Sequence, residues 1–501
     1  MVKYDVIVIG AGNGGLAAAA LASMKGMKTL LFEKHNLPGG SASSFRRGRF
    51  EFEPSCHEIA EVGSPEKPGP TRKLFEDLGS DAQFVFEDSL YRVICTDKKE
   101  PFNVKLPAGL ENLYNKLEEI SPGCRESVVH FFEYQKKAMD MAEKLQAKKI
   151  SLKDLPDIMN LLRFVSRPAD KIMTMFGIPQ KVQYMLSAYW TYVGEPTSTL
   201  NAFMLAMMDY VYADYGAGLP SMFSHELSLS FDKTIRKNGG QIFYNSPVRK
   251  ILVKKRKAYG VIANGKKYYA DYIICNAFPN DVFGRMISKR EVPIIEIKRA
   301  NSRELALSFV NVYLGLNKSA EELGIDDYTT FLLQKAESDA QYKECFGLGG
   351  KGWVIVNNLN VAIPDCSPEG TSHMSLTCAV YGDAWSKIEP KDYKKTKLKI
   401  AEQMIDYYQK STGIIIKPYI EEIEVATPVT FSRYLGTPNG TPYGYQTRDW
   451  DGIFLRTMNM LKERTLKNFR FCGAHTENSL GYNQTYKSGK IAVEELEKKR
   501  K

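Results

Sequence analysis

Hydrophobic positions near the start of the chain change from the spacing of a strand to that of a helix and back. Residues 4–9 and 28–32 are short apolar runs, the first of them rich in β-branched side chains. Between them, residues 16–22 consist of leucine and alanine, which favour a helix. The first run is followed by Gly10-Ala11-Gly12-Asn13-Gly14-Gly15, and the second by Glu33. The pattern predicts a strand, a glycine turn, a helix and a second strand.

The same reasoning predicts strands and helices along the rest of the chain. Alternating or apolar runs predict strands at residues 45–53, 83–86, 91–95, 102–106, 305–316, 354–356, 375–380 and 469–474. Residues 251–270 predict a β-meander with a hairpin turn at Asn264-Gly265. Helical spacing predicts helices at 71–78, through most of 109–215, at 221–237, at 391–408 and from 488 onward.

The glycine turn has the spacing that a dinucleotide-binding unit requires. Gly10 permits the tight turn, Gly12 lets the backbone approach a pyrophosphate, and Gly15 lets the helix pack closely on the strand. The helix N-terminus offers free N–H groups to the phosphates. Glu33, at the end of the second strand, can accept hydrogen bonds from a ribose. Because strand, helix and acid all agree with the glycine motif, the pattern indicates a dinucleotide site.

A second glycine pair distinguishes flavin from nicotinamide. Lys34 and the Gly39-Gly40-Ser41 stretch resemble the FAD-binding N-terminus of the glutathione-reductase-like flavoprotein superfamily. Within it the chain resembles the phytoene desaturase, carotenoid isomerase and retinol saturase group. Phe52, Glu53 and His57 match that group's Phe-Asp-x-Gly-x-His stretch, from which Ser55 departs. Residues 426–434 and 440–444 are similar to its Thr-Pro-x-Thr-x-x-Arg-Tyr and Gly-x-x-Tyr-Gly motifs.

The resemblance extends to the C-terminal part of the chain. Gly473, Thr476, Gly481, Ser488 and Gly489 match the group's glycine-rich flavin loop, whereas residues 475, 478–480 and 483–485 do not. The resemblance implies FAD as the cofactor, with Val248 near the adenine and Asn276 at the end of a strand near the flavin. The cofactor residues so implied are Gly10, Gly12, Asn13, Gly14, Gly15, Glu33, Lys34, Gly39, Gly40, Ser41, Val248, Asn276, Gly473, Thr476 and Gly481.

The fold class implied is α/β, with two interleaved domains. Residues 1–80, 216–295 and 455–501 are expected to form a Rossmann-like FAD-binding domain, with a parallel sheet and a β-meander. Residues 81–215 and 296–454 are expected to form a substrate-binding domain of mixed sheet and helices, mostly helical over 109–215.

Composition places the chain among ordinary globular proteins. The 501 residues are 44% hydrophobic and 25% charged, with a formal net charge of +10. No basic patch accompanies a nucleic-acid module, so nucleic acid is not an expected partner. We find no secretory signal and no apolar stretch long enough to span a membrane. The eight cysteines and six histidines lack metal-ligand spacing, so no metal is expected, and the location expected is the cytoplasm.

Methionine and tyrosine gather between residues 136 and 222. More than half of the 18 methionines lie there, which suits a long apolar ligand as well as it suits an ordinary helical core. Lysines flank the stretch at 136–153, with apolar side chains at 155–164. These form either a solvated helix face, the simpler interpretation, or a surface in peripheral contact with a membrane.

The chemistry expected is hydride transfer at flavin N5 to or from a carbon–carbon double bond of an isoprenoid or other lipid-like substrate. The enzyme would be a saturase, desaturase or isomerase. Residues 347–352 lack the setting of a second dinucleotide motif, so a diffusible electron donor or acceptor is expected. Two alternatives share the fold: a flavin amine oxidase, and a non-enzymatic lipid-binding protein like the prenyl-binding GDP-dissociation inhibitors.

Little acid–base machinery is needed for an apolar substrate. The side chains suited to moving a proton are His57, Glu58, Tyr443, Glu477 and Tyr482, of which we single out His57, Glu477 and Tyr482 as catalytic candidates. For Glu477, and for His475 in the same stretch, hydrogen bonding to the phosphate or ribitol, or exposure to solvent, is the simpler interpretation.

Overall fold

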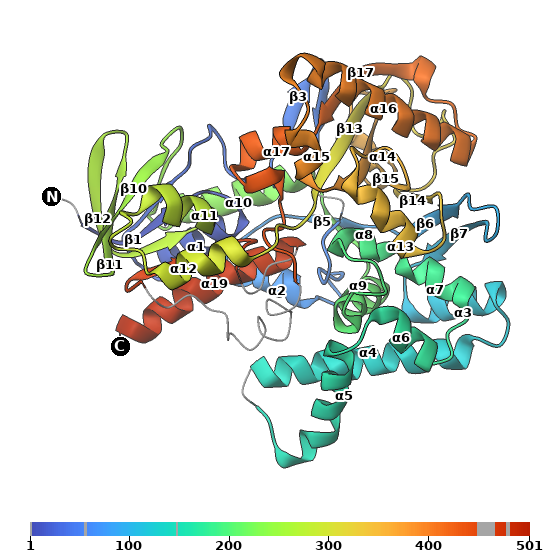
Figure 1. The fold of residues 1–501 in the computed structure, drawn as a ribbon, viewed down its shortest axis with the longest axis horizontal. Coiled ribbons are helices and arrows are strands. Elements are labelled where there is room, and N and C mark those ends of the chain that lie inside the picture. Colours follow the sequence, from blue (N-terminus) through green and yellow to red (C-terminus); the bar gives the residue numbers. More distant parts are fainter. Residues whose placement is uncertain (1–2, 55–57, 147–148, 448–465, 477–480, 501) are drawn as a thin grey trace.

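Two seven-stranded sheets organise the computed structural model, which describes residues 3–54, 58–146, 149–447, 466–476 and 481–500 (Figure 1). The first sheet has the order β10-β11-β12-β1-β2-β9, with β18 beside β12. Its strands are β1 (Lys3–Ile9), β2 (Thr29–Phe32), β9 (Gln241–Phe243), β10 (Val248–Lys254), β11 (Lys257–Ala263), β12 (Lys266–Cys275) and β18 (Phe469–Phe471). β1, β2, β9, β12 and β18 pair in parallel, and β10 and β11 continue the sheet from β12 as an antiparallel meander.

Helices from both ends and the middle of the chain cover the first sheet. α1 (Asn13–Met24) packs against α10 (Phe223–Lys237) and α19 (Gly481–Arg500), with α2 (Pro70–Asp77) beside α19. Seven consecutive residues of α1, Leu16 to Ala22, are buried because neighbours enclose the helix on several sides. The alanines allow this close packing, which explains why the helix carries no amphipathic pattern.

The second sheet has the order β17-β13-β16-β15-β14-β6-β7. Its strands are β6 (Ser89–Cys95), β7 (Phe102–Pro107), β13 (Ser308–Leu316), β14 (Thr329–Leu333), β15 (Trp353–Asn358), β16 (Ser372–Val380) and β17 (Ile420–Ala426). One face packs on α16 (Pro390–Thr412), and the other contributes Phe331 and Ile355 to the core of a helical lobe. The lobe comprises α3 (Leu110–Ile120), α4 (Arg125–Gln146), α5 (Leu155–Val165), α6 (Ala169–Met175), α7 (Gln180–Leu186), α8 (Trp190–Val193) and α9 (Ala202–Tyr215).

Short elements connect these layers. Two small antiparallel sheets pair β3 (Phe45–Arg47) with β4 (Phe50–Phe52), and β5 (Phe84–Phe86) with β8 (Gly218–Pro220). The short helices are α11 (Pro279–Asp281), α12 (Ile294–Ser302), α13 (Ser338–Lys343), α14 (Leu359–Ala362), α15 (Gly382–Ser386) and α17 (Pro428–Leu435).

The α/β fold class is confirmed, with one parallel-plus-meander sheet and one mixed sheet beside helices. The strands of the first sheet all come from segments expected in the FAD-binding domain, and those of the second from segments expected in the substrate-binding domain. The division into domains stays a prediction. Contacts cross it, and among them is the close packing of Phe50 of β4 on β13, where a Cβ on Gly315 would stand 2.5 Å from the Phe50 ring.

Two element predictions were wrong. The single strand expected at residues 45–53 is a hairpin, because Gly48, with a φ of +51°, reverses the chain between β3 and β4. The C-terminal helix begins at Gly481 and not at Ser488. Residues 482–487 contain neither glycine nor proline, so nothing in them stops a helix from extending toward its N-terminus. Tyr482 and Thr485 therefore lie on the first turns of α19 and not in a loop.

An acidic side chain is buried inside the helical lobe. Asp209 on α9 is 2% exposed, and neither carboxyl oxygen has a hydrogen-bond partner among the described residues. Burial raises the pKa of Asp209 well above its usual range, and the side chain of Gln135 on α4 works against that rise. The folded protein therefore holds Asp209 as a neutral acid, whereas the unfolded chain ionises it.

We expect Asp209→Asn to stabilise the protein at neutral pH. Because the folded pKa lies above the unfolded one, the wild type loses stability as pH rises above about 4, at up to about 1.4 kcal/mol per pH unit, and the uncharged amide escapes this loss. Unfolding in urea at pH 5 and pH 8 measures the effect. The exposed Asp365→Asn is the control. An equal difference between Asp209→Asn and wild type at both pH values contradicts the prediction.

Candidate functional site: a glycine-lined cofactor cradle

The glycine turn joins β1 to α1 with little space for side chains. Gly10 has a φ of +92°, which favours glycine. A Cβ on Gly15 would stand 1.9 Å from the Gly10 carbonyl oxygen. Gly12 is the N-cap of α1, no side chain caps the helix, and its first turn holds no acidic residue. The N–H groups at this end of α1 are therefore available to an anionic group.

Glu33 and the second glycine pair lie against this turn. Glu33 is buried and accepts hydrogen bonds from the backbone N–H of Ala11, at 2.6 Å, and of His35, at 2.8 Å. Each carboxylate oxygen retains a further lone pair for a hydroxyl donor. Gly39 donates its N–H to the Ala11 carbonyl at 2.7 Å and bridges Gly12. The two glycine segments are thus joined through backbone, and a Cβ on Gly40 would stand 3.4 Å from the Gly12 Cα.

The C-terminal segment completes the arrangement from the far end of the chain. A Cβ on Gly14 would stand 2.6 Å from the Gly473 backbone nitrogen, and one on Gly489 would stand 2.2 Å from the Gly14 carbonyl oxygen. The Gly473 N–H donates to Ser488 Oγ at 2.7 Å. Asn276, at the end of β12, places its side chain between Gly12 and Gly473. These close approaches explain why small residues recur at both ends of the chain.

The other expected cofactor residues lie around this centre. Ser246 donates its N–H to the Glu33 carbonyl at 2.7 Å, which holds the start of β10, and with it Val248, beside the end of β2. Thr476 Oγ1 donates to the Gly473 carbonyl at 2.8 Å. Asn13 Nδ2 lies 3.3 Å from Thr485 Oγ1, and Ser41 is joined to Tyr482. Gly481 begins α19, and Lys34, directly after Glu33, is exposed.

Of the three catalytic candidates, only Tyr482 lies in the described part of the chain. Tyr482 is partly buried beside the core under the first sheet, and its hydroxyl lies 3.5 Å from the Ser41 carbonyl oxygen. His57 and Glu477 lie outside the described residues. Ser488 and Gly489 contact Gly473 and Gly14, respectively. In the sequence both match the flavoprotein group, but no role at the site was predicted for them.

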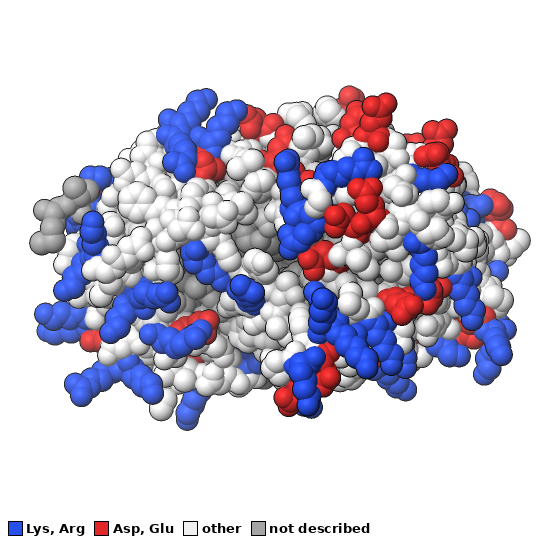
Figure 2. Space-filling model, turned by 90° about the horizontal axis from the view of Figure 1, so that it is seen from above, with Lys and Arg blue, Asp and Glu red and all other residues white. Residues whose placement is uncertain are grey.

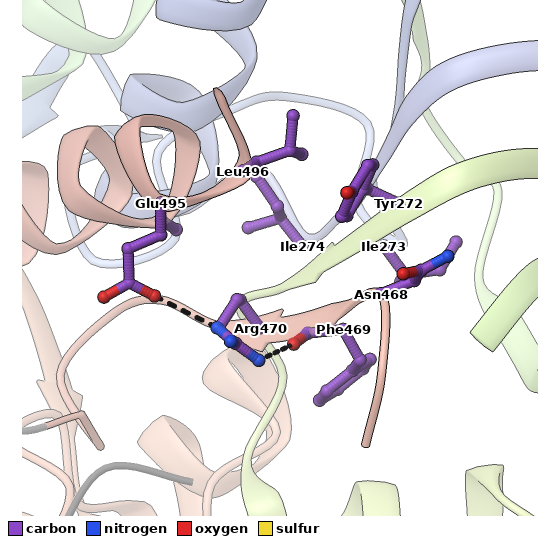
Figure 3. A pocket seen from close by; sticks show the side chains of 9 residues that line it. Tyr272, Ile273, Ile274, Asn468, Phe469, Arg470, Glu495 and Leu496 are labelled. Atoms are coloured by element: carbon purple, nitrogen blue, oxygen red, sulfur yellow. Dashed lines mark hydrogen bonds and ion pairs between the residues drawn. The ribbon is translucent and has the colours of Figure 1, made fainter. Parts of the chain in front are cut away.

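A small pocket shows how the C-terminal segment is fixed to the first sheet (Figure 3). It lies between β12, β18 and α19, and is lined mainly by apolar side chains such as Ile274 and Leu496. Arg470 donates through Nε to Glu495 Oε2 at 3.0 Å and through a terminal nitrogen to the Phe469 carbonyl at 2.7 Å. The pocket contains no arrangement for chemistry, and its ion pair ties β18 to α19.

The residues present fit a bound dinucleotide. No side chain fills the space where the glycine turn at Gly10–Gly15 meets the Gly39-Gly40 pair, and the uncapped N-terminus of α1 points into this space. Two buried polar atoms nearby, Asn13 Oδ1 and His475 Nε2, have no hydrogen-bond partner among the described residues. Burial, together with the charge of Arg303, lowers the pKa of His475 to about 3, so its imidazole is neutral. Polar groups of this kind usually have a partner in a native structure.

A buried acid lies at the junction of the two sheets. Glu58 follows β4, and the next residue, Ile59, forms an isolated bridge with Gly218 of β8. Thr329 Oγ1 on β14 lies 3.4 Å from Glu58 Oε2. Burial raises the pKa of Glu58 to about 8, with the charge of Glu87 adding to the rise, while hydrogen bonding from Tyr192 and Thr329 opposes it. Glu58 is thus largely protonated at neutral pH.

Rings surround this acid on the side of the helical lobe. Tyr189 stacks on Tyr212 with ring centroids 5.0 Å apart, and Tyr192 packs on Phe331 at 5.7 Å. All of these side chains belong to or pack against the core that joins the lobe to the second sheet. Among the described residues of 136–222, Met141, Met173, Met185 and Met204 are buried in this core, whereas Met159, Met175 and Met222 are exposed. The region is therefore partly core and partly surface.

The fold and the glycine-lined site fit the class of flavin oxidoreductases. The chain belongs to the family of flavin containing amine oxidoreductases, which matches residues 14–496. It is 27% identical over 496 residues to a chloroplastic prolycopene isomerase of Daucus carota, covering 90% of this chain and 76% of that protein. It is 24% identical over 502 residues to a 1-hydroxycarotenoid 3,4-desaturase of a Flavobacterium species, covering 97% and 98%. A solved oxidoreductase from Methanosarcina mazei shares the fold with a TM-score of 0.64, at 14% identity, covering 98% of this chain and all of that one.

Proposed function

We propose that the protein is an FAD-dependent oxidoreductase that acts on carbon–carbon double bonds of a hydrophobic, polyene-like substrate, as a saturase, desaturase or isomerase. The observation that carries this proposal is the meeting of Gly12, Gly14 and Gly473 at the uncapped N-terminus of α1, with Glu33 beside it. The similarity to an isomerase and a desaturase of carotenoids supports the substrate class.

The chain's own residues would bind the cofactor in a fixed order along the cradle. The N–H groups at the start of α1 would bind the pyrophosphate, and Glu33 would accept from the ribose hydroxyls. Asn276, Gly473 and Thr476 lie toward the flavin end in this proposal. When bound, FAD exchanges a hydride with a substrate carbon through N5.

Glu58 is suited to supply the proton that such a reaction needs. Saturation of a double bond adds a hydride to one carbon and a proton to its neighbour, and desaturation removes both. A protonated carboxyl group at the junction of the two sheets, lined by aromatic rings, is neutral before the reaction and can donate that proton, which leaves a carboxylate that must be reprotonated before the next turnover. We add Glu58 to His57, Glu477 and Tyr482 as a candidate proton donor.

The direct test uses the purified, flavin-loaded protein without oxygen. We expect photoreduced protein to be reoxidised by lipids that carry conjugated double bonds, followed at the visible flavin band. We also expect the oxidised protein to keep its flavin colour when mono- and diamines are added. Reduction of the flavin by amines, with no reoxidation by any polyene, would overturn the proposal in favour of the amine oxidase alternative. A colourless protein that yields no FAD on denaturation would favour the lipid-binding alternative.

Two further expectations belong to this proposal. The electrons are exchanged with a diffusible donor or acceptor, since the sequence contains one convincing dinucleotide motif. A polyene lipid partitions into bilayers, so the enzyme meets its substrate at a membrane surface on the cytoplasmic side. Reduction of the flavin by added NADPH would identify a diffusible nicotinamide as the donor, whereas failure of every added small-molecule or protein carrier to exchange electrons would contradict this expectation and leave the cofactor assignment intact.

A further inference from the structure

One helix of the lobe carries its apolar residues on the outside. The segment from Ile150 through α5 projects from the body of the molecule at the foot of Figure 1. Leu152, Leu155, Met159 and Leu162 are spaced by three, four and three residues and so share one side of the helix. They are 94%, 58%, 60% and 38% exposed. The opposite side of α5 is the packed one, with Leu161 and Phe164 buried.

The fully exposed charges around these residues have one sign. From 149 to 175, the exposed charged side chains are all basic: Lys149, Lys153, Arg163, Arg167 and Lys171. The acids of this stretch are Asp154, Asp157 and Asp170, and each is only partly exposed. Asp154 is bonded to Lys144 at 3.0 Å and to the Ser151 hydroxyl at 2.7 Å. The side of the molecule away from α5 differs, because basic and acidic side chains intermix there (Figure 2).

Apolar side chains ringed by basic ones match the lipid–water interface of a bilayer. Full burial of a leucine or methionine contributes about 1.5–3 kcal/mol, and each basic residue near an anionic surface about 1 kcal/mol. Met159 and Leu162, together with Arg163 and Arg167, also line an open surface pocket. Its apolar side chains suit an acyl chain, and its basic side chains suit a phosphate group. No helix in the described part of the chain is long and apolar enough to span a membrane.

We propose that the α5 surface docks onto an anionic lipid bilayer, with the helix lying in the plane of the interface. We define the α5 surface as Ile150, Leu152, Leu155, Met159 and Leu162 with the basic residues Lys149, Lys153, Arg163 and Arg167. A second copy of the chain is a poorer occupant, because two such surfaces would bring basic residues against basic residues. The proposal rests on exposure and charge and does not depend on the identity of the substrate.

The test is co-sedimentation of the full, flavin-loaded chain with vesicles in the absence of substrate. We expect binding to vesicles of phosphatidylcholine with phosphatidylserine, weaker binding to phosphatidylcholine alone, and loss of the difference at high salt. The double variant Leu155→Ser/Met159→Ser should lower the partition coefficient at least ten-fold. Lys149→Glu/Lys153→Glu should abolish the preference for phosphatidylserine while keeping the weaker binding.

A stringent control has equally exposed apolar residues on another helix, again flanked by exposed basic residues such as Lys289, Arg290 and Lys298. Ile294 and Ile295 on α12 are 71% and 55% exposed. We expect Ile294→Ser/Ile295→Ser to bind vesicles like wild type. Absence of wild-type binding to either vesicle, or equal loss in both double variants, would overturn the proposal. So would a dimer in sedimentation velocity that only the α5 variant dissociates, because it would assign the surface to self-association. Flavin content, measured on the same samples, tests the proposed function separately.

Discussion

Gly12→Val is expected to fold and to purify with less than about one tenth of the wild-type flavin. A Cβ at this position would stand 2.5 Å from Asn276 Nδ2, the tip of a flexible side chain that can move, so the fold tolerates the change. The valine would nevertheless fill the space in front of the N-terminus of α1, where the pyrophosphate is proposed to bind. A ten-fold weaker binding of flavin corresponds to a loss of about 1.4 kcal/mol of binding free energy. A side chain that blocks the pyrophosphate position is expected to cost at least this much.

Visible absorbance per protein chain measures the flavin content, and near-ultraviolet circular dichroism reports the fold. The matched control is Gly284→Val, since a Cβ on Gly284 meets no heavy atom within 4 Å. Full flavin content in Gly12→Val would mean that the cofactor does not approach α1 at its N-terminus. Loss of the native dichroism in Gly12→Val but not in Gly284→Val would mean that Gly12 is needed for the fold itself.

Glu58→Gln is expected to lower the rate of proton-dependent turnover by about 10²–10⁴-fold. The amide keeps the size and the hydrogen-bond acceptor of Glu58 but cannot release a proton. In the direction of saturation, the form of Glu58 that the wild type requires is the protonated acid, which is present below the folded pKa. Activity should therefore fall as pH rises through about 8. The pH profile of kcat/KM, with a conjugated lipid as substrate, measures both effects.

A neighbouring acid provides the matched control. Glu87 raises the pKa of Glu58 through its charge. We expect Glu87→Gln to keep most of the turnover rate and to move the alkaline limb of the profile to lower pH. A wild-type profile that is flat between pH 6 and 9, or a Glu58→Gln variant with full activity, would exclude Glu58 as the donor and leave His57, Glu477 and Tyr482.

Much of the fold could be predicted from short stretches of the sequence. The β-branched run at 4–9, the glycine turn and the alanine-rich helix each favour one conformation with little help from the rest of the chain, and β1 and α1 form where they were predicted. The same holds for the Asn264-Gly265 turn, where both residues have a positive φ and join β11 to β12. Such elements are predictable because neighbours in the sequence determine them.

Features that depend on distant segments were not predictable. Asp209 lies among tyrosines and methionines in the sequence, and only the packing of α9 against α4 makes it a buried acid. One of the two backbone donors to Glu33 is Ala11, across the first strand-turn-helix unit. α19 begins earlier than predicted because residues 482–487, where the resembled group has a glycine-rich loop, contain neither glycine nor proline here. At the cofactor site, the sequence indicated which glycines belong together. It did not indicate that the Asn276 side chain lies between Gly12 and Gly473.

The packing of α19 on α1 also bears on how the protein is made. Asn13 and Thr485, whose side chains meet at 3.3 Å, are separated by 472 residues in the chain. During synthesis α1 leaves the ribosome long before its partner exists, so the cradle cannot close while the chain is still growing. Contacts of such long range are formed late in folding. Flavin should therefore be captured only after the segment that carries α19 has been made, and its supply at that moment would decide how much of the protein matures.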